Sequence, residues 1–169
     1  MDASNHLNQA GEVHMVDVSG KPESARKATA EGFLTVSREI LARAVGEGAP
    51  KGDVLAVARV ASIMAAKRTA EWIPLCHPIP ITGIEVAIRP ESDGIRVRVE
   101  VVTMAATGVE MEALTAVSAA LLTLYDMLKG MDRGMMIQSV RLLEKTGGQS
   151  GHFRARSEGG WDEDRGLDG

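Results

Sequence analysis

Two neighbouring segments alternate apolar and polar residues, and this pattern constrains the fold more than any other feature of the sequence. Residues 83–89 and 95–101 each carry isoleucine or valine at every second position. Alternation with a period of two is typical of strands that are buried on one face only. The turn sequence Ser92-Asp93-Gly94 lies between the two segments, and the sequence therefore predicts an antiparallel hairpin.

Two longer apolar segments predict helices that pack on this sheet. Residues 53–72 are apolar around most of the helical circumference, which is typical of a helix buried on several sides, and Pro74 is expected to stop it. Residues 108–130 carry apolar side chains at helical spacing. Thr107, followed three residues later by Glu110, fits a capping box at the start of that second helix.

Weaker patterns complete the set of elements. Residues 25–36 predict a first strand, and Ser37 is expected to cap a short helix that ends near Gly46 or Gly48. Residues 135–145 predict a final strand. The order strand, helix, helix, strand, strand, helix, strand predicts an α+β, ferredoxin-like fold with a mostly antiparallel sheet covered by helices.

Composition limits the classes of protein to which the chain can belong. With 169 residues, 44% of them hydrophobic, we expect a single domain at 14–153, between a flexible N-terminus (1–13) and a disordered acidic tail (154–169). The formal net charge of -4 argues against a nucleic-acid or membrane partner. The single cysteine and the lack of a secretory signal or of a membrane-spanning apolar run predict a cytoplasmic protein.

The common nucleotide and metal motifs are absent. The sequence contains no GxxxxGK[ST], no GxGxxG after a strand and no HExxH. The four histidines are scattered, and Cys76 beside His77 lacks two further ligands at zinc-like spacing, so we predict no metal site. Adjacent side chains in an extended segment point apart, which argues against a nucleophile and base pair formed by these two residues.

The second long helix carries carboxylates near both of its ends. Asp126 and Lys129 share a face, and the pattern favours a surface ion pair over an acid and base pair. Glu110 is explained by capping, whereas Glu112 lies on a different side of the helix. Fourteen residues place Glu112 and Asp126 on nearly the same face but about 21 Å apart along the axis. Either the ligand is long or the two helix ends meet across a subunit interface.

Three further segments have both a structural and a binding interpretation. Lys51-Gly52 precedes a helix and is suited to hold phosphate, although a lysine there is also ordinary. Two prolines rigidify the loop 74–78, which is either a corner or a binding loop. Residues 145–148 (KTGG) either grip phosphate or lead flexibly into the tail, and Arg26 taken alone is an exposed cation.

Taken together and in order, these segments resemble the molybdenum cofactor biosynthesis protein C family, the cyclic pyranopterin monophosphate synthases. IPLCHP followed by GVEMEALTA and then YDM is the most specific part of the resemblance. The matching segments cover nearly the whole core and are HMVDVS (14–19), KGDV (51–54), AAKRT (65–69), IPLCHP (73–78), TGVEMEALTA (107–116), LYDMLK (124–129) and VRLLEKTGG (140–148).

The resemblance implies a ferredoxin-like homohexamer, a trimer of dimers with its site at a subunit interface. It implies conversion of 3',8-cyclo-7,8-dihydroguanosine 5'-triphosphate to cyclic pyranopterin monophosphate and diphosphate, with no required cofactor, although Mg²⁺ can accompany the triphosphate. The implied catalytic residues are Asp126, Lys129 and Lys51, and the implied substrate-binding residues are Leu75, Cys76, His77, Met111, Glu112, Arg26, Glu110 and Lys145. Similar proteins usually carry lysine where this chain has Gln149, so a phosphate role of that segment rests on Lys145.

The residue types fit such a reaction. Closing a cyclic phosphate with loss of diphosphate needs a proton acceptor and cations that neutralise the departing charge, and proton transfer at the purine suits a lysine of lowered pKa. Two rival hypotheses are a non-catalytic ferredoxin-like module that senses a small nucleotide or a partner subunit, and a structural oligomeric scaffold. The first predicts that Asp126→Ala leaves function intact, and the second predicts no stabilisation by any ligand.

Overall fold

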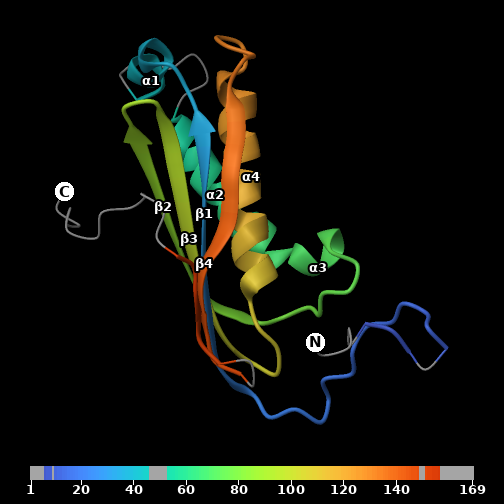
Figure 1. Cartoon of the computed structure of the whole chain (residues 1–169). Coiled ribbons are helices and arrows are strands. Elements are labelled where there is room, and N and C mark those ends of the chain that lie inside the picture. Colours follow the sequence, from blue (N-terminus) through green and yellow to red (C-terminus); the bar gives the residue numbers. More distant parts are fainter. Residues whose placement is uncertain (1–5, 9, 46–52, 149–150, 157–169) are drawn as a thin grey trace.

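The computed structural model describes residues 6–8, 10–45, 53–148 and 151–156, and its centre is one antiparallel sheet. The sheet has the strand order β2-β3-β1-β4-β5 (Figure 1). Its strands are β1 (Ser24–Thr35), β2 (Ile81–Glu91), β3 (Gly94–Ala105), β4 (Met136–Thr146) and the short β5 (Phe153–Arg154). The first four strands and the helices between them form the predicted ferredoxin-like arrangement.

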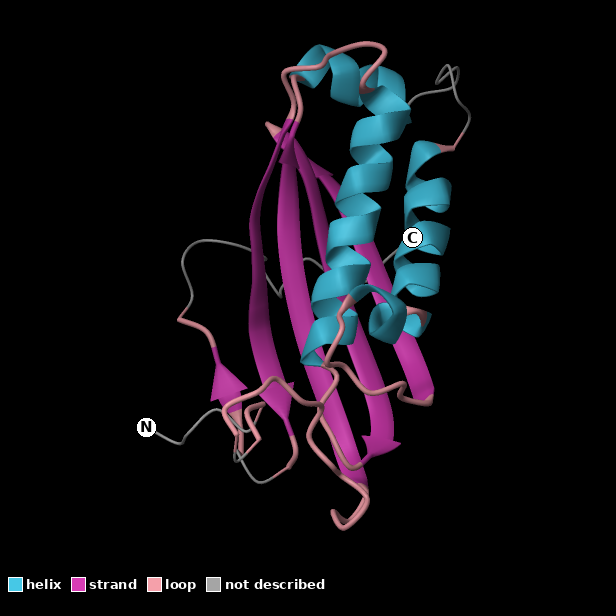
Figure 2. Ribbon diagram, turned by 90° about the vertical axis from the view of Figure 1, so that its right-hand side faces the viewer, coloured by secondary structure: helices cyan, strands magenta, loops and turns pink. Residues whose placement is uncertain are grey.

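Two long helices lie side by side on one face of this sheet (Figure 2). They are α2 (Val54–Lys67) and α4 (Glu110–Leu128), and the shorter helices are α1 (Arg38–Val45) and α3 (Thr69–Trp72). α4 packs on α2 and on strands β1, β3 and β4, whereas α2 reaches β2. α4 therefore runs along the middle of the sheet.

Small residues let α4 approach β1 closely. A Cβ atom added to Gly32 would lie 2.6 Å from Leu121 Cδ1 and 2.9 Å from Val117 Cγ1, so only glycine fits at this point of β1. α4 is long and apolar enough to cross a membrane by length and composition alone. Ten of its residues are buried, and its packing on the sheet and α2 accounts for this apolar composition.

Most predicted elements are confirmed. The hairpin forms with Glu91 paired to Gly94, and both of its strands extend beyond the predicted segments. Ser37 Oγ accepts a hydrogen bond from the backbone N–H of Ile40 at 3.4 Å, as expected for a helix cap. Gly46 and Gly48, near which α1 was expected to end, lie outside the described residues, and the domain boundaries at residues 13 and 154 stay predictions.

The prediction of one helix over residues 53–72 is wrong, because α2 ends at Lys67. Arg68 leaves the helical conformation with φ −117° and ψ 17°. The hydroxyl of Thr69 donates to the carbonyls of Ala65 and Ala66, at 3.3 and 3.0 Å. A hydroxyl that binds these carbonyls competes with the next backbone N–H groups, and the chain turns into the separate helix α3.

The burial predicted for this helix is also only partly observed. Val57, Val60 and Met64 are 44%, 56% and 47% exposed, so α2 presents an apolar outer face in the single chain. Its inner residues, among them Ala58 and Ser62, are fully buried against the rest of the fold. The apolar circumference was correctly recognised, but the single chain buries only part of it.

The capping box at Thr107 is a further wrong prediction. The residue before the first turn of α4 is Val109, and no side chain caps the helix there. Thr107 lies two residues too early because Gly108 and Val109 still belong to the loop. The Glu110 carboxylate folds back over Gly108, where an added Cβ would lie 1.9 Å from Oε2, and it also pairs with Lys145.

We expect Leu121→Ala to destabilise the fold by about 3 kcal/mol, because it removes a fully buried side chain and leaves a cavity against β1. Leu122→Ala is the matched control, since its side chain is 54% exposed, and should change the free energy of unfolding by less than about 0.5 kcal/mol. Urea denaturation of both variants at one protein concentration measures the difference. Equal losses would contradict this account of the core.

Candidate active site

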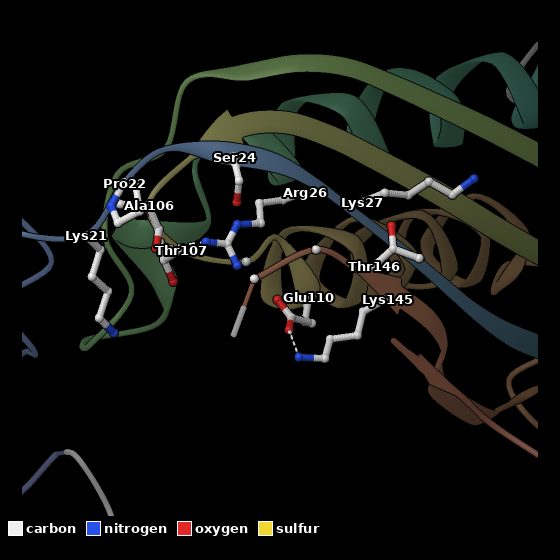
Figure 3. A pocket seen from close by; sticks show the side chains of 13 residues that line it. Lys21, Pro22, Ser24, Arg26, Lys27, Ala106, Thr107, Glu110, Lys145 and Thr146 are labelled. Carbon is white, nitrogen blue, oxygen red and sulfur yellow. Dashed lines mark hydrogen bonds and ion pairs between the residues drawn. The ribbon is translucent and has the colours of Figure 1, made fainter. Parts of the chain in front are cut away.

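One end of the sheet carries a cavity lined mainly by polar and basic residues. It lies where β1 begins, β3 and β4 end and α4 starts, and its volume is about 620 Å³ (Figure 3). We call it the basic pocket. The residues that line it are Lys21, Pro22, Ser24, Arg26, Lys27, Ala106, Thr107, Gly108, Glu110, Lys145, Thr146, Gly147 and Gly148.

Backbone carbonyl groups orient Arg26 in this pocket. Its Nε and Nη2 atoms donate to the carbonyls of Ala105 and Ala106, both at 3.3 Å. The interpretation of Arg26 as a plain exposed cation is therefore wrong, because the side chain is half-buried and held at the end of β3. The guanidinium keeps its full charge and has N–H groups left over for an anionic ligand.

Two glycines allow the end of β4 to bend around this guanidinium. Gly147 and Gly148 have φ values of 92° and 80°, which L-residues with side chains rarely adopt. An added Cβ would lie 2.1 Å from the Ala25 carbonyl oxygen at Gly147, and 1.6 Å from Arg26 Nη1 at Gly148. Of the two interpretations of residues 145–148, the geometry supports the binding one, because the segment forms a wall of the basic pocket.

The other cations of the pocket differ in their partners. Lys145 Nζ lies 3.5 Å from Glu110 Oε1, and Lys27 Nζ lies 2.7 Å from Glu100 Oε2. Figure 3 marks the pair of Lys145 and Glu110 with a dashed line. Glu110 therefore neutralises part of the positive charge. The pocket as a whole still has an excess of basic over acidic lining residues, which suits a ligand with several negative charges.

A second cavity of about 370 Å³ adjoins the basic pocket and is lined in part by the loop 74–78. We call it the loop pocket. Six of the predicted substrate-binding residues line it together, namely Leu75, Cys76, His77, Glu110, Met111 and Glu112. The two pockets share Lys21, Thr107, Gly108 and Glu110. The two pockets therefore adjoin, and we call them together the groove; all eight predicted binding residues line it.

Glu112 is the buried acid of this groove. It is 4% exposed, and burial raises its pKa to about 7, with a further contribution from the nearby charge of Glu110. It also borders a third cavity of about 350 Å³ beside the break between α2 and α3. Near neutral pH a carboxyl group with this pKa both accepts and donates protons, which is useful for a ligand that exchanges protons.

Cys76 and His77 have different surroundings although they are adjacent. Burial raises the pKa of the Cys76 thiol, and the charge of Glu112 adds to this, so the thiol is a poor nucleophile. His77 Nε2 lies 2.7 Å from the backbone carbonyl oxygen of Val16. A carbonyl only accepts, and Nε2 must therefore carry a proton.

The predicted catalytic pair lies away from the groove. Asp126 and Lys129 are joined by an ion pair of 2.6 Å at the far end of α4, and their side chains are 59% and 52% exposed. The preferred interpretation as a surface ion pair is confirmed for the single chain. The hydrogen bond and charge of Asp126 raise the pKa of Lys129, contrary to the lowered pKa expected for a proton-transferring lysine.

Two predictions on phosphate binding lie outside the described residues, because neither Lys51 nor Gln149 belongs to them. Within the described ranges there is no group of three or more His, Cys, Asp or Glu side chains suited to a metal ion.

Lys21 is the residue of the groove that sequence reasoning missed. It lines both pockets, yet its only signal was its position in the segment that follows HMVDVS. Ser24 and Thr107 were also not predicted as site residues, since a short polar side chain in a loop has many other uses.

The chain is thus a ferredoxin-like α+β protein with a groove that has a basic end and a half-buried end, and the half-buried end holds an acid with a raised pKa. The MoaC family model matches residues 15–148, and the chain belongs to this family. It is 49% identical to the cyclic pyranopterin monophosphate synthase of Pelotomaculum thermopropionicum over 99% of this chain and 100% of that protein. It is 55% identical to the synthase of the same name from Thermomicrobium roseum over 90% of this chain and 93% of that protein.

The raised pKa of Glu112 predicts that this residue lowers the stability of the fold at high pH. Its pKa is about 7 in the folded state and 4.5 ordinarily, so the group has little effect on the free energy of unfolding below pH 4.5. It destabilises the folded state increasingly as the pH rises from 4.5 to 7, and the full effect is present above pH 7. Glu112→Gln should therefore raise the free energy of unfolding at pH 8.5 by up to about 3 kcal/mol and change it little near pH 4.5.

Denaturation of the wild type, Glu112→Gln and Glu39→Gln at both pH values measures this effect. Glu39 is exposed on α1, so its variant controls for the loss of one carboxylate. A Glu112→Gln variant with the same stability as the wild type at both pH values would show that the carboxylate carries no burial penalty.

Proposed function

We infer that this chain is a cyclic pyranopterin monophosphate synthase, which converts 3',8-cyclo-7,8-dihydroguanosine 5'-triphosphate to cyclic pyranopterin monophosphate and diphosphate. The observation that carries the inference is the groove, in which the loop pocket and the basic pocket adjoin and share a wall. A nucleoside triphosphate has the same two parts, an uncharged bicyclic base and a chain of negative charges. The curated relatives with this name match nearly the full length of the chain.

The two pockets suit these two parts for different reasons. Arg26, Lys145 and Lys21 supply cations at the basic end, where the diphosphate leaves and its charge must be neutralised. Glu112 and the neighbouring loop residues supply a half-buried surface with an acid that titrates near neutrality, which suits a base that is opened and closed again. In this proposal the cyclised guanine lies in the loop pocket and the triphosphate in the basic pocket.

We further propose a homohexamer, a trimer of dimers, in which Asp126 and Lys129 of one subunit complete the groove of another. Within one chain α4 separates these residues from Glu112 by about 21 Å. Apolar side chains exposed in the single chain support an assembly, both on α2 (Val57, Val60 and Met64) and near the N-terminus (Leu7, Val13 and Met15).

In the assembled site Asp126 would accept the proton of the attacking hydroxyl group, and Lys129 and Lys51 would stabilise the phosphate or transfer protons. Lys129 has a raised pKa in the single chain. Burial in the groove of a second subunit would lower the pKa of Lys129 again. We propose no resident cofactor, with Mg²⁺ accompanying the triphosphate, and a cytoplasmic location.

The direct test is incubation of the purified protein with the cyclised guanosine triphosphate, with detection of diphosphate and of the pterin. We expect turnover by the wild type and a loss of kcat by a factor of about 10² to 10⁴ for Asp126→Asn, because the variant cannot accept a proton. Asp132→Asn, which changes an aspartate in the loop after α4, should keep its activity. No turnover by folded, oligomeric wild type would overturn the proposed function.

Mixing two inactive variants tests the shared site. Asp126→Asn removes the proposed proton acceptor at one end of α4, and Arg26→Ala removes a cation at the other end. If each site takes these residues from different subunits, random subunit exchange restores roughly a quarter of the wild-type activity. If one chain holds the complete site, the mixture stays as inactive as its components.

A further inference from the structure

The segment before β1 crosses the groove without forming a strand or a helix. We call residues 14–21 the N-terminal strap. Val16, Val18 and Lys21 line the loop pocket together with Leu75, Cys76 and His77, and Lys21 also lines the basic pocket. The strap therefore forms one wall of the site, although it belongs to neither the sheet nor the helices.

One side chain ties the strap to the rigid loop. His77 Nε2 donates to the Val16 carbonyl across 2.7 Å, and 61 residues separate the two in the sequence. The prolines at positions 74 and 78 limit the freedom of the loop and so fix the direction of this donor. The bond uses the Nε2 atom of His77, and only Nδ1 of a neutral imidazole is left to accept a hydrogen bond from a ligand.

A tight turn then directs Lys21 toward the groove. The Asp17 carboxylate accepts the backbone N–H of Ser19 at 2.9 Å, and the backbone N–H of Lys21 donates to the Val18 carbonyl at 3.0 Å. The first of these bonds lowers the pKa of Asp17. Side-chain and backbone bonds of this kind close a loop locally, so the position of Lys21 depends on the turn and on the point where the strap is tied down.

Charge indicates what Lys21 is suited to bind. Among the described residues no ion pair involves Lys21 or Arg26, whereas Lys27 and Lys145 each have a carboxylate partner. Figure 3 shows Lys21 and Lys145 on opposite sides of Arg26 in the basic pocket. Lys21 and Arg26 are therefore the lining cations of the basic pocket without a carboxylate partner among the described residues. Lys21 lies where the basic pocket meets the loop pocket.

We propose that the N-terminal strap is a substrate-binding element, that His77 acts as a positioning residue which fastens it, and that Lys21 contacts the phosphate chain at the junction of the two pockets. This assignment rests on the proposed function for the identity of the ligand. It goes beyond that function because it gives His77 a role through the Val16 carbonyl and adds Lys21 to the binding residues.

Binding of inorganic diphosphate tests the role of Lys21 without requiring turnover. Calorimetry should show that Lys21→Ala weakens diphosphate binding about tenfold or more, since a charged hydrogen bond is removed. Lys21→Arg should retain most of the affinity, and Arg43→Ala, which removes an exposed cation of α1, should match the wild type. Equal affinity of Lys21→Ala and wild type would overturn the assignment of Lys21.

Two variants of His77 test the fastening of the strap. His77→Leu removes the donor, whereas His77→Gln keeps an N–H group at a similar reach. Hydrogen exchange should become faster in a peptide covering the strap of His77→Leu, with α4 unchanged as the control for folding, and His77→Gln should restore slow exchange. Unchanged exchange of the strap in a folded His77→Leu variant would overturn the role of His77.

Kinetics separate this proposal from the proposed function. With an active wild type, His77→Leu should raise KM about tenfold while kcat changes less than twofold, because the strap binds the substrate but does not react. A loss confined to kcat would overturn the positioning role. If wild type shows no turnover but diphosphate binding and strap exchange respond as expected, the synthase activity fails and the strap assignment stands.

Discussion

α4 packs along the middle of the sheet, and this contact determines where both ends of the helix lie. Gly32 lets the helix approach β1, and the close contact with Val117 and Leu121 fixes the helix along the strand direction. A rigid helix of this length determines what each end can do. Its first turn places Glu110 and Glu112 beside the ends of the strands, and its last turn carries Asp126 and Lys129 away from them. No side-chain movement brings the two ends together.

The groove forms where the ends of β3 and β4 meet the first turn of α4, and each of these elements contributes a different feature. The end of β3 offers carbonyl groups that orient Arg26, and the end of β4 offers two glycines that let the backbone pass its guanidinium. The first turn of α4 contributes a buried acid whose charged form is disfavoured by burial. Cations and a carboxyl group that titrates near neutrality thus line one groove, which suits a ligand with a charged chain and a polar, uncharged ring.

Sequence patterns predicted the elements better than their boundaries and contacts. Alternation identified the β2–β3 hairpin because the period of a half-buried strand is a local property. The break at Arg68 was missed because it depends on one hydroxyl, that of Thr69, binding carbonyls of the preceding turn. The resemblance identified eight of the residues that line the groove, but not Lys21, Ser24 or Thr107. It did not show that His77 binds a carbonyl 61 residues away, because such a contact exists only in the folded chain.

The electrostatics of Lys129 give a reason why the proposed assembly would serve the chemistry as well as the geometry. In the single chain its ammonium group is exposed and bound to Asp126, which raises the pKa of Lys129 and favours its charged form. A pair in this state holds its proton and cannot exchange it readily with a substrate. In the proposed assembly, burial against a second subunit would penalise both charges, and an incoming triphosphate would compete with Asp126 for the lysine. A carboxylate released in this way becomes a better proton acceptor, so substrate binding and activation of the base would be one event.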